Sequence, residues 1–162
     1  MAAQQHPGTA QESIWEYPRP PRVEDCFKHV QVVFNGMAIA DSQQSVRVLE
    51  KGHPPVFYFP PEDVFVKTLA ETAHRTTCEF KGEAHYYTIS VGGRQAENAA
   101  WCYPEPAPPY TRIKRYLAFY PRLMDACLVD DEAATPEDGD FYGGWITRDI
   151  TGMTEKGSQK GA

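Results

Sequence analysis

The sequence predicts an all-β domain, mainly antiparallel, in which short strands form a compact roll or sandwich with little helix. Two apolar runs flank Asn35-Gly36, and two more flank Gly92-Gly93. Both dipeptides supply the left-handed residues that a tight hairpin turn requires. The chain also holds 14 prolines and 12 glycines and has no long amphipathic stretch. This composition favours many short strands over long helices.

The segment before the first hairpin is expected to be extended. Residues 13–25 are rich in proline, which fixes φ and removes a backbone donor, so this stretch cannot be a central strand. Its aromatic residues Trp15 and Tyr17 are expected to pack it onto the domain. Residues 29–41 then form the first hairpin, around the Asn-Gly turn.

The middle of the chain predicts two further short strands. Residues 45–49 alternate β-branched side chains and place Arg47 in the centre of one face. Residues 56–59 are β-formers bracketed by two Pro-Pro pairs. Residues 62–71 fit a short helical turn or a strand, and the sequence leaves both open.

The second half of the chain continues in the same manner. Residues 85–104 predict a hairpin around Gly92-Gly93, and residues 116–131 predict two short strands around a turn at Pro121-Arg122. Its length of 162 residues suits one domain. We expect residues 13–150 to form that single β domain. Residues 1–12 and 151–162 lack an apolar pattern and are expected to be a disordered N-terminus and a flexible tail.

Charge and composition exclude several classes of partner. The net charge is −6 and the basic residues are scattered, whereas a nucleic-acid binder needs a broad basic surface. No apolar run approaches the length of a membrane span, and no signal peptide is recognised, so a soluble cytoplasmic protein is expected. The four cysteines are widely spaced without a C-x-x-C pair. We therefore expect reduced thiols, no metal and no cofactor.

Several stretches together resemble one known family. They are WEYPRPPRVE (15–24), RVLEKGHPPVFYFPPEDV (47–64), CEFKGEAHYY (78–87), AAWCYPEP (99–106), LAFYP (117–121) and GDFYGGWIT (139–147). In this order they resemble the domain of unknown function 427 family, which also carries a nucleotidyltransferase-type label. The resemblance implies a compact antiparallel fold of the β-tent type, shared with methionine sulfoxide reductase B. It implies no activity, and the chain lacks the Gly-Ser and paired-Asp pattern of a two-metal nucleotidyltransferase.

Glu50 and His53 are the candidate catalytic pair. Pro54 and Pro55 exclude a helix here, but in a loop the two side chains can converge on one bound group. A histidine beside a carboxylate is a common acid–base arrangement. The alternative is an exposed glutamate and a histidine that caps a backbone carbonyl.

Charged residues give further candidates for ligand binding. Residues 78–82, treated as a strand, place Glu79 and Lys81 on one face. A lysine beside a carboxylate can bind an anion or equally form a surface pair of little energetic value. Gly82 indicates close approach by a backbone or a ligand. Arg47 and Lys81 are expected to hold an anionic or carbonyl group.

Aromatic residues are the largest candidate set. Aromatic rings with a polar atom line small-molecule pockets and also fill ordinary cores. Tyr58, Tyr87, Trp101 and Tyr103 are the candidates for one cleft, because polar residues lie close to them in sequence. Trp101 and Tyr103 are expected to share a face.

These candidates lead to two hypotheses of different class. The first is a domain that binds a small-molecule ligand in an aromatic-lined pocket and acts on it by acid–base chemistry, as an isomerase or cyclase does. The second is a non-catalytic module that binds a protein or peptide through its proline-rich, aromatic surface. A homodimer is compatible with the sequence, which does not decide the oligomeric state.

Overall fold

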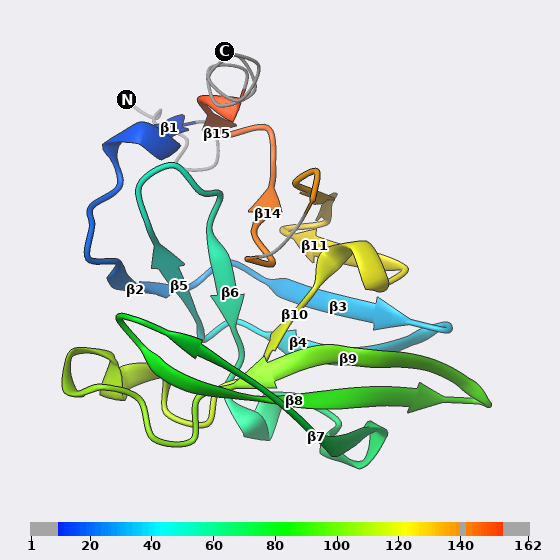
Figure 1. Cartoon of the computed structure of the whole chain (residues 1–162). Coiled ribbons are helices and arrows are strands. Elements are labelled where there is room, and N and C mark those ends of the chain that lie inside the picture. The colour runs from blue at the N-terminus through cyan, green and yellow to red at the C-terminus, as the bar shows by residue number, and fades with distance from the viewer. Residues whose placement is uncertain (1–9, 140–141, 154–162) are drawn as a thin grey trace.

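A computed structural model describes residues 10–139 and 142–153, and these form a mainly antiparallel β structure, as predicted (Figure 1). The strands are β1 (Glu12–Ser13), β2 (Arg22–Cys26), β3 (Val30–Phe34), β4 (Met37–Ser42), β5 (Ser45–Leu49), β6 (Val56–Tyr58), β7 (Leu69–Cys78), β8 (Gly82–Val91), β9 (Arg94–Cys102), β10 (Ala118–Phe119), β11 (Ala126–Val129), β12 (Glu132–Ala133), β13 (Thr135–Pro136), β14 (Trp145–Ile146) and β15 (Ile150–Thr151). Five short 3₁₀ turns connect them: η2 (Ile14–Glu16), η3 (Pro61–Asp63), η4 (Val66–Thr68), η5 (Pro108–Ile113) and η6 (Pro121–Leu123). No helix in these residues is long and apolar enough to cross a membrane.

Three sheets build the body of the domain. One has the order β10-β9-β8-β7, the second β12-β11-β3-β4, and the third β2-β5-β6. All pairs within these sheets are antiparallel. The long β7–β8 hairpin crosses below β5 and β6 in Figure 1. The β-tent topology implied by the family resemblance stays a prediction.

Both predicted hairpins are confirmed. In the β3–β4 turn Asn35 and Gly36 have φ of 48° and 81°, and in the β8–β9 turn Gly92 and Gly93 have φ of 58° and 84°. Two consecutive left-handed residues match the twist of the flanking strands, which is why this turn chemistry fixes the hairpin position.

The structure of residues 62–82 differs in part from the prediction. Residues 62–71 contain two 3₁₀ turns and then the start of β7, so each alternative holds for part of the range. The prediction of a strand through residues 78–82 is wrong. Cys78 pairs with Gly82, and the chain reverses at residues 79–81 between them. Gly82 permits the reversal because its φ is +111°.

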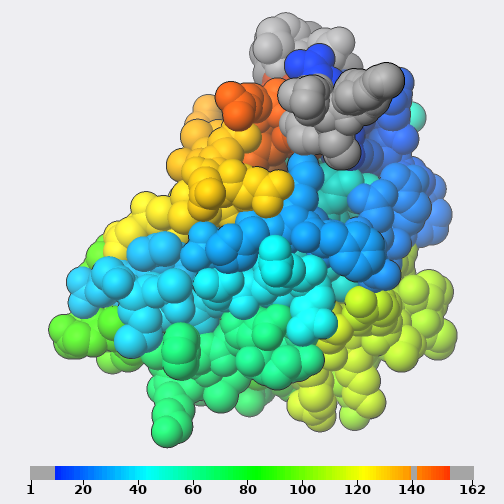
Figure 2. All heavy atoms as spheres, turned by 180° about the vertical axis from the view of Figure 1, so that it is seen from behind, coloured from blue at the N-terminus to red at the C-terminus, as the bar shows by residue number. Residues whose placement is uncertain are grey.

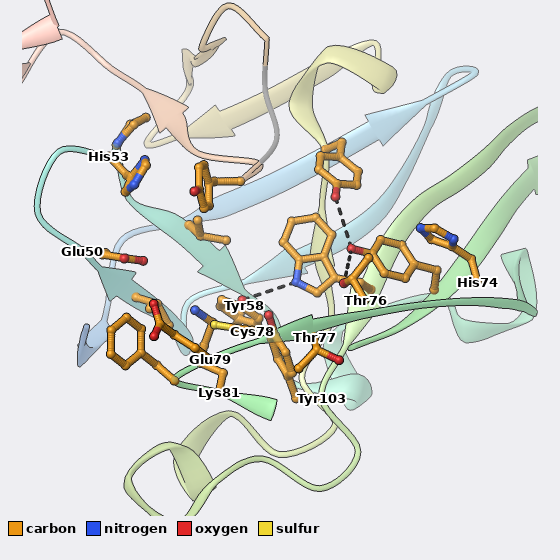
Figure 3. Close-up of a pocket in the computed structure, with 18 residues that line it drawn as sticks. Glu50, His53, Tyr58, His74, Thr76, Thr77, Cys78, Glu79, Lys81 and Tyr103 are labelled. Carbon is orange, nitrogen blue, oxygen red and sulfur yellow. Dashed lines mark hydrogen bonds between the residues drawn. The ribbon is translucent and has the colours of Figure 1, made fainter. Parts of the chain in front are cut away.

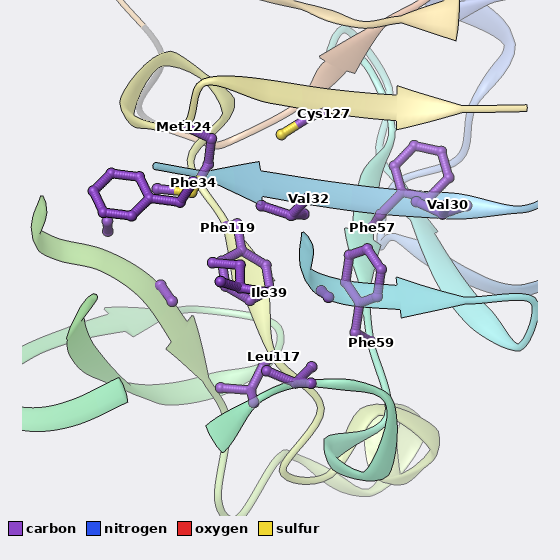
Figure 4. Close-up of a cluster of buried hydrophobic side chains, with 14 of the residues drawn as sticks. Val30, Val32, Phe34, Ile39, Phe57, Phe59, Leu117, Phe119, Met124 and Cys127 are labelled. Atoms are coloured by element: carbon purple, nitrogen blue, oxygen red, sulfur yellow. The ribbon is translucent and has the colours of Figure 1, made fainter. Parts of the chain in front are cut away.

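The main core lies where β3, β4, β6 and β10 face one another (Figure 4). Phe34, Ile39, Phe59 and Phe119 are at most 1% exposed there, and the Phe59 and Phe119 rings meet edge to face at 5.8 Å. From behind, β3 and β4 form a blue-to-cyan band across the surface of the domain (Figure 2). Strand β3 alternates buried and less buried residues, as expected for a sheet with one face on the core.

The two ends of the described chain meet. Strand β1 pairs in parallel with β15, and the indole nitrogen of Trp15 donates to the carbonyl of Gly152 at 3.1 Å. Tyr17 is 5% exposed, so both aromatic residues pack this segment onto the domain as expected. Glu12 and Thr151, which were expected in the unstructured ends, therefore belong to the folded body. Residues 1–9 and 154–162 lie outside the described part.

Candidate functional site

A cavity of about 480 Å³ lies between the sheet that contains β5 and β6 and the hairpin of β7 and β8 (Figure 3). Seven of the nine predicted site residues line it: Glu50, His53, Tyr58, Glu79, Lys81, Trp101 and Tyr103. They come from the loop after β5, from β6, from the β7–β8 turn and from β9 with the residue that follows it. Segments far apart in the sequence thus converge on one space.

Trp101 carries most of the aromatic wall. Its ring centroid lies 4.5 Å from that of Tyr120 and 6.3 Å from those of Tyr58 and Tyr86. The Tyr58 contact is edge to face, with an interplanar angle of 88°. Such arrangements align the positive edge of one ring with the negative face of another. The result is a rigid apolar wall for a flat ligand.

Hydroxyl groups are distributed along this wall and already bonded. The Trp101 indole nitrogen donates to the Tyr58 hydroxyl at 3.4 Å. The Tyr86 hydroxyl bonds to the hydroxyls of Thr76 at 2.9 Å and Tyr120 at 3.4 Å. The network holds the side chains in place and leaves directed polar atoms at the cavity surface.

Two of the tyrosines stay neutral. Burial raises the pKa of the Tyr58 and Tyr103 hydroxyls well above the usual range, because a low-dielectric site disfavours the phenolate. At neutral pH both side chains are hydroxyl donors and acceptors rather than bases. Tyr58 and Tyr103 therefore do not serve as bases in the cavity, whose lining also holds Glu50, Glu79, His53 and His74.

Lys81 is fixed by a backbone hydrogen bond and, unlike most lysines, has little exposed surface. Its carbonyl accepts from the amide of Ala107 at 2.9 Å, and the Glu105 carbonyl lies 3.5 Å from the position of a Cβ on Gly82. The latter is an ordinary van der Waals distance, so the φ of +111° favours glycine at this position and a close backbone approach does not. Lys81 is only 8% exposed. Its ammonium lies 5.8 Å from the centroid of the Tyr103 ring, and no carboxylate of the described residues forms an ion pair with it.

Glu50 and His53 lie at the mouth of the cavity. The amide of His53 donates to the Glu50 carbonyl at 3.0 Å and closes a tight turn. The Glu50 carboxylate lies 3.3 Å from the Arg19 guanidinium, so a cation already balances its charge. The His53 ring lies 4.0 Å from that of Tyr142. The turn therefore brings both side chains to one edge of the cavity, where solvent and a ligand meet them.

The outer wall is the edge strand β7. His74, Thr76, Thr77 and Cys78 line the cavity from this strand, and the His74 ring lies 4.6 Å from that of Tyr86. The first three are exposed, so this wall of the cavity also faces solvent. Sequence reasoning did not select any of these four, because it did not identify β7 as a complete strand.

Tyr87 does not line the cavity, and Tyr86 does. Tyr86 is directly opposite Trp101 in the β8–β9 register, so the two share a face, whereas the adjacent Tyr87 points the other way. The Tyr87 hydroxyl instead lies 3.5 Å from the Cys102 sulfur. Burial raises the pKa of the Cys102 thiol, which is the opposite of an activated thiolate. The register, once known, would have selected the correct tyrosine.

Arg47 does not line this cavity either. Its guanidinium lies 3.0 Å from the Glu12 carboxylate and forms a second ion pair with Glu24, and its side chain is 12% exposed. It borders a separate cavity of about 190 Å³ near β1 and β15. A guanidinium with two carboxylate partners has little left to offer a ligand, so Arg47 ties β1 to β2 and β5.

This arrangement predicts a specific dependence of stability on pH. Burial raises the pKa of Glu12, but the hydrogen bonds from Arg47 and Tyr17 and the Arg47 charge outweigh it, so the pKa lies below its ordinary value of 4.5. A carboxyl with a depressed folded pKa adds stability above its unfolded pKa and loses it as pH falls through the folded value. With 35% of the Glu12 side chain exposed, we expect a contribution of about 1 kcal/mol.

Urea unfolding from about pH 6 down to about pH 3 measures this contribution. The natural chain should lose more unfolding free energy over this range than Arg47→Met, whose Glu12 no longer has its cation. Parallel curves for the two proteins would show that Arg47 does not depress the Glu12 pKa.

The described residues contain no group of three or more His, Cys, Asp or Glu side chains arranged to hold a metal ion. The cavity therefore offers aromatic surface, neutral hydroxyls, one buried amine and a mouth with a carboxylate and an imidazole. Proton transfer, polar binding and addition to the amine are the chemistries that these groups support.

Comparison with known proteins gives the family and no activity. Residues 22–130, about two thirds of the chain, match the model of a domain of unknown function, DUF427. No curated protein matches the chain. The matched range includes all nine predicted site residues and ends before Tyr142. The chain belongs to the DUF427 family.

Proposed function

We propose that the cavity binds a small planar ligand and that Lys81 holds a carbonyl or anionic group of that ligand. The observation that carries this proposal is the lysine itself, which is 8% exposed among aromatic side chains and has no ion-pair partner in the described residues. An amine at the surface of a cavity, without an ion pair among the described residues, can donate hydrogen bonds to a polar group of a ligand. The place of Lys81 on the cavity lining therefore supports binding there.

The shape of the cavity supports a small molecule over a peptide. A volume of about 480 Å³ falls within the range of ordinary ligand sites. Trp15 and Tyr17 lie in a separate cluster with Ile14 and Leu49, so the cavity is not filled by the proline-rich segment. Binding of a peptide to the aromatic surface is the alternative, and it would not require the buried amine.

Acid–base turnover is the second part of the proposal. Glu50 and His53 share the mouth of the cavity, where a general base or acid can reach a bound ligand from one side. A proton shift between two carbons or a ring closure fits one carboxylate and one imidazole around a planar substrate. If Glu50→Gln and His53→Ala both leave binding and turnover unchanged in folded protein, this assignment is wrong.

A thermal-shift screen tests the binding proposal. Single-ring aromatic aldehydes, ketones and carboxylates, with benzaldehyde and benzoate as the first members, are added to the natural chain. A ligand present at about 100 times its dissociation constant adds about 2.7 kcal/mol of stability, which raises the melting temperature by several degrees. We expect a shift for at least one compound that carries a polar group beside the ring.

Two variants make this screen specific for the cavity. Lys81→Met keeps the length and most of the packing of the side chain but removes the amine, and it should abolish the shift. Tyr87→Phe removes a hydroxyl that lies outside the cavity, and it should leave the shift intact. Equal shifts for Lys81→Met and the natural chain would show that the amine does not hold the ligand.

A further inference from the structure

The charges around the cavity favour a neutral carbonyl over an anion as the group that meets Lys81. Glu50 is balanced by Arg19 at 3.3 Å, which leaves Glu79 at the rim and Lys81 inside as the remaining opposite charges on the lining. The lining therefore has no excess of positive charge to attract a carboxylate or phosphate. A neutral aldehyde or ketone enters without electrostatic penalty.

The lysines of the described chain differ sharply in environment. Lys28 pairs with Asp149 at 3.7 Å, and Lys51, Lys67 and Lys114 are exposed. Lys81 is the buried one among them, and it faces aromatic surface. The amine of Lys28 is engaged by a carboxylate, whereas the amine of Lys81 lines the cavity without an ion pair among the described residues, which is where a nucleophilic lysine can meet a ligand carbonyl.

We propose that Lys81 forms an imine with the aldehyde or ketone of the ligand, an inference that rests on the proposed binding function. The Nζ lone pair attacks the carbonyl carbon, and the carbonyl oxygen takes up a proton to give a carbinolamine. Nitrogen then loses a proton, the hydroxyl leaves as water after protonation, and a C=N bond forms. One amine and one carbonyl become one imine and one water, without an oxidant or reductant.

The surroundings of Lys81 suit both steps of this reaction. The Tyr103 ring centroid lies 5.8 Å from Nζ, and both residues line the same cavity. Tyrosine hydroxyls near the reacting atoms can donate a hydrogen bond to the carbonyl oxygen as it gains charge. Aromatic walls also exclude water, so they disfavour hydrolysis of the imine once the water has left.

Reductive trapping tests the imine directly. The natural chain is incubated with benzaldehyde and sodium cyanoborohydride, which converts an imine to a stable benzylated amine, and the modified lysines are located by peptide mass mapping. Lys81 is expected to be modified at benzaldehyde concentrations at least tenfold below those needed for Lys51, Lys67 and Lys114 in the same sample. Equal modification of all four lysines would overturn the proposal.

Matched variants and a matched probe separate the imine from simple binding. Lys81→Arg keeps the positive charge but cannot form an imine, and it should lose the low-concentration adduct, while Lys67→Arg should keep it. Benzyl alcohol has the same ring without the carbonyl. If benzaldehyde stabilises the natural chain more than benzyl alcohol does and Lys81 stays unmodified, the imine is wrong and the binding function stands. If neither stabilises the chain and Lys81 stays unmodified, both proposals fail.

Discussion

Replacement of Trp101 by alanine is expected to reduce the unfolding free energy by about 3–5 kcal/mol and to abolish ligand binding. Trp101 is 4% exposed and touches the rings of Tyr58, Tyr86 and Tyr120. Its removal leaves a large void between rings that cannot close it without moving strands. Denaturant unfolding of the variant and the natural chain measures the loss.

Two further variants serve as comparisons for Trp101→Ala. Trp101→Phe keeps an aromatic ring and loses the hydrogen bond to Tyr58, so it should lose less stability and keep weakened binding. Phe65→Ala removes an aromatic side chain that is 60% exposed and should change stability by no more than about 0.5 kcal/mol. A Trp101→Ala protein as stable as Phe65→Ala would contradict the buried position of the indole.

Alanine at Gly143 is expected to be the second most damaging change. Gly143 has φ of +72°, and a Cβ there would lie 2.4 Å from the Trp101 ring. The left-handed backbone costs about 1 kcal/mol for a residue with a side chain, and forcing a methyl group into a packed aromatic wall adds about 1–3 kcal/mol. We expect a total loss of about 2–4 kcal/mol together with weaker ligand binding, because the indole must move.

Gly93 provides a matched control for the backbone part of this effect. It has φ of +84°, and nothing lies within 4 Å of the position of its Cβ. Gly93→Ala should therefore show only the cost of the left-handed backbone, about 1 kcal/mol, with unchanged binding. Chemical unfolding of both variants gives the loss of unfolding free energy for each. The difference between the two losses measures the cost of the contact with Trp101. Equal losses would mean that the segment around Gly143 does not press on the indole.

The site was partly predictable from the sequence. Glu50, His53 and Tyr58 lie within one short stretch around Pro54-Pro55, and that stretch borders the cavity. Lys81 was selected for its spacing from Glu79 on a strand, whereas both residues belong to a turn. Both residues do line the cavity, but the turn between β7 and β8 brings them there, and not a shared strand face.

Tyr87 and Arg47 show why the remaining assignments failed. Two adjacent tyrosines on a strand face opposite sides, and only the pairing of β8 with β9 decides which one joins Trp101. Arg47 is a plausible anion ligand in its own strand, but Glu12 and Glu24 approach it from β1 and β2. Neither the register nor those partners can be read from the neighbouring residues.

The sequence by itself determined the all-β class, the positions of the two glycine-containing hairpins and the aromatic character of the site. These features follow from turn chemistry and side-chain alternation, which act between residues a few positions apart. Only the tertiary structure decided which side chains meet in the cavity, that Lys81 is 8% exposed and has no ion pair among the described residues, and that Arg47 is occupied elsewhere. Those outcomes depend on strand register and on contacts between distant segments, where the energies of packing and charge pairing are set by geometry that no local stretch contains.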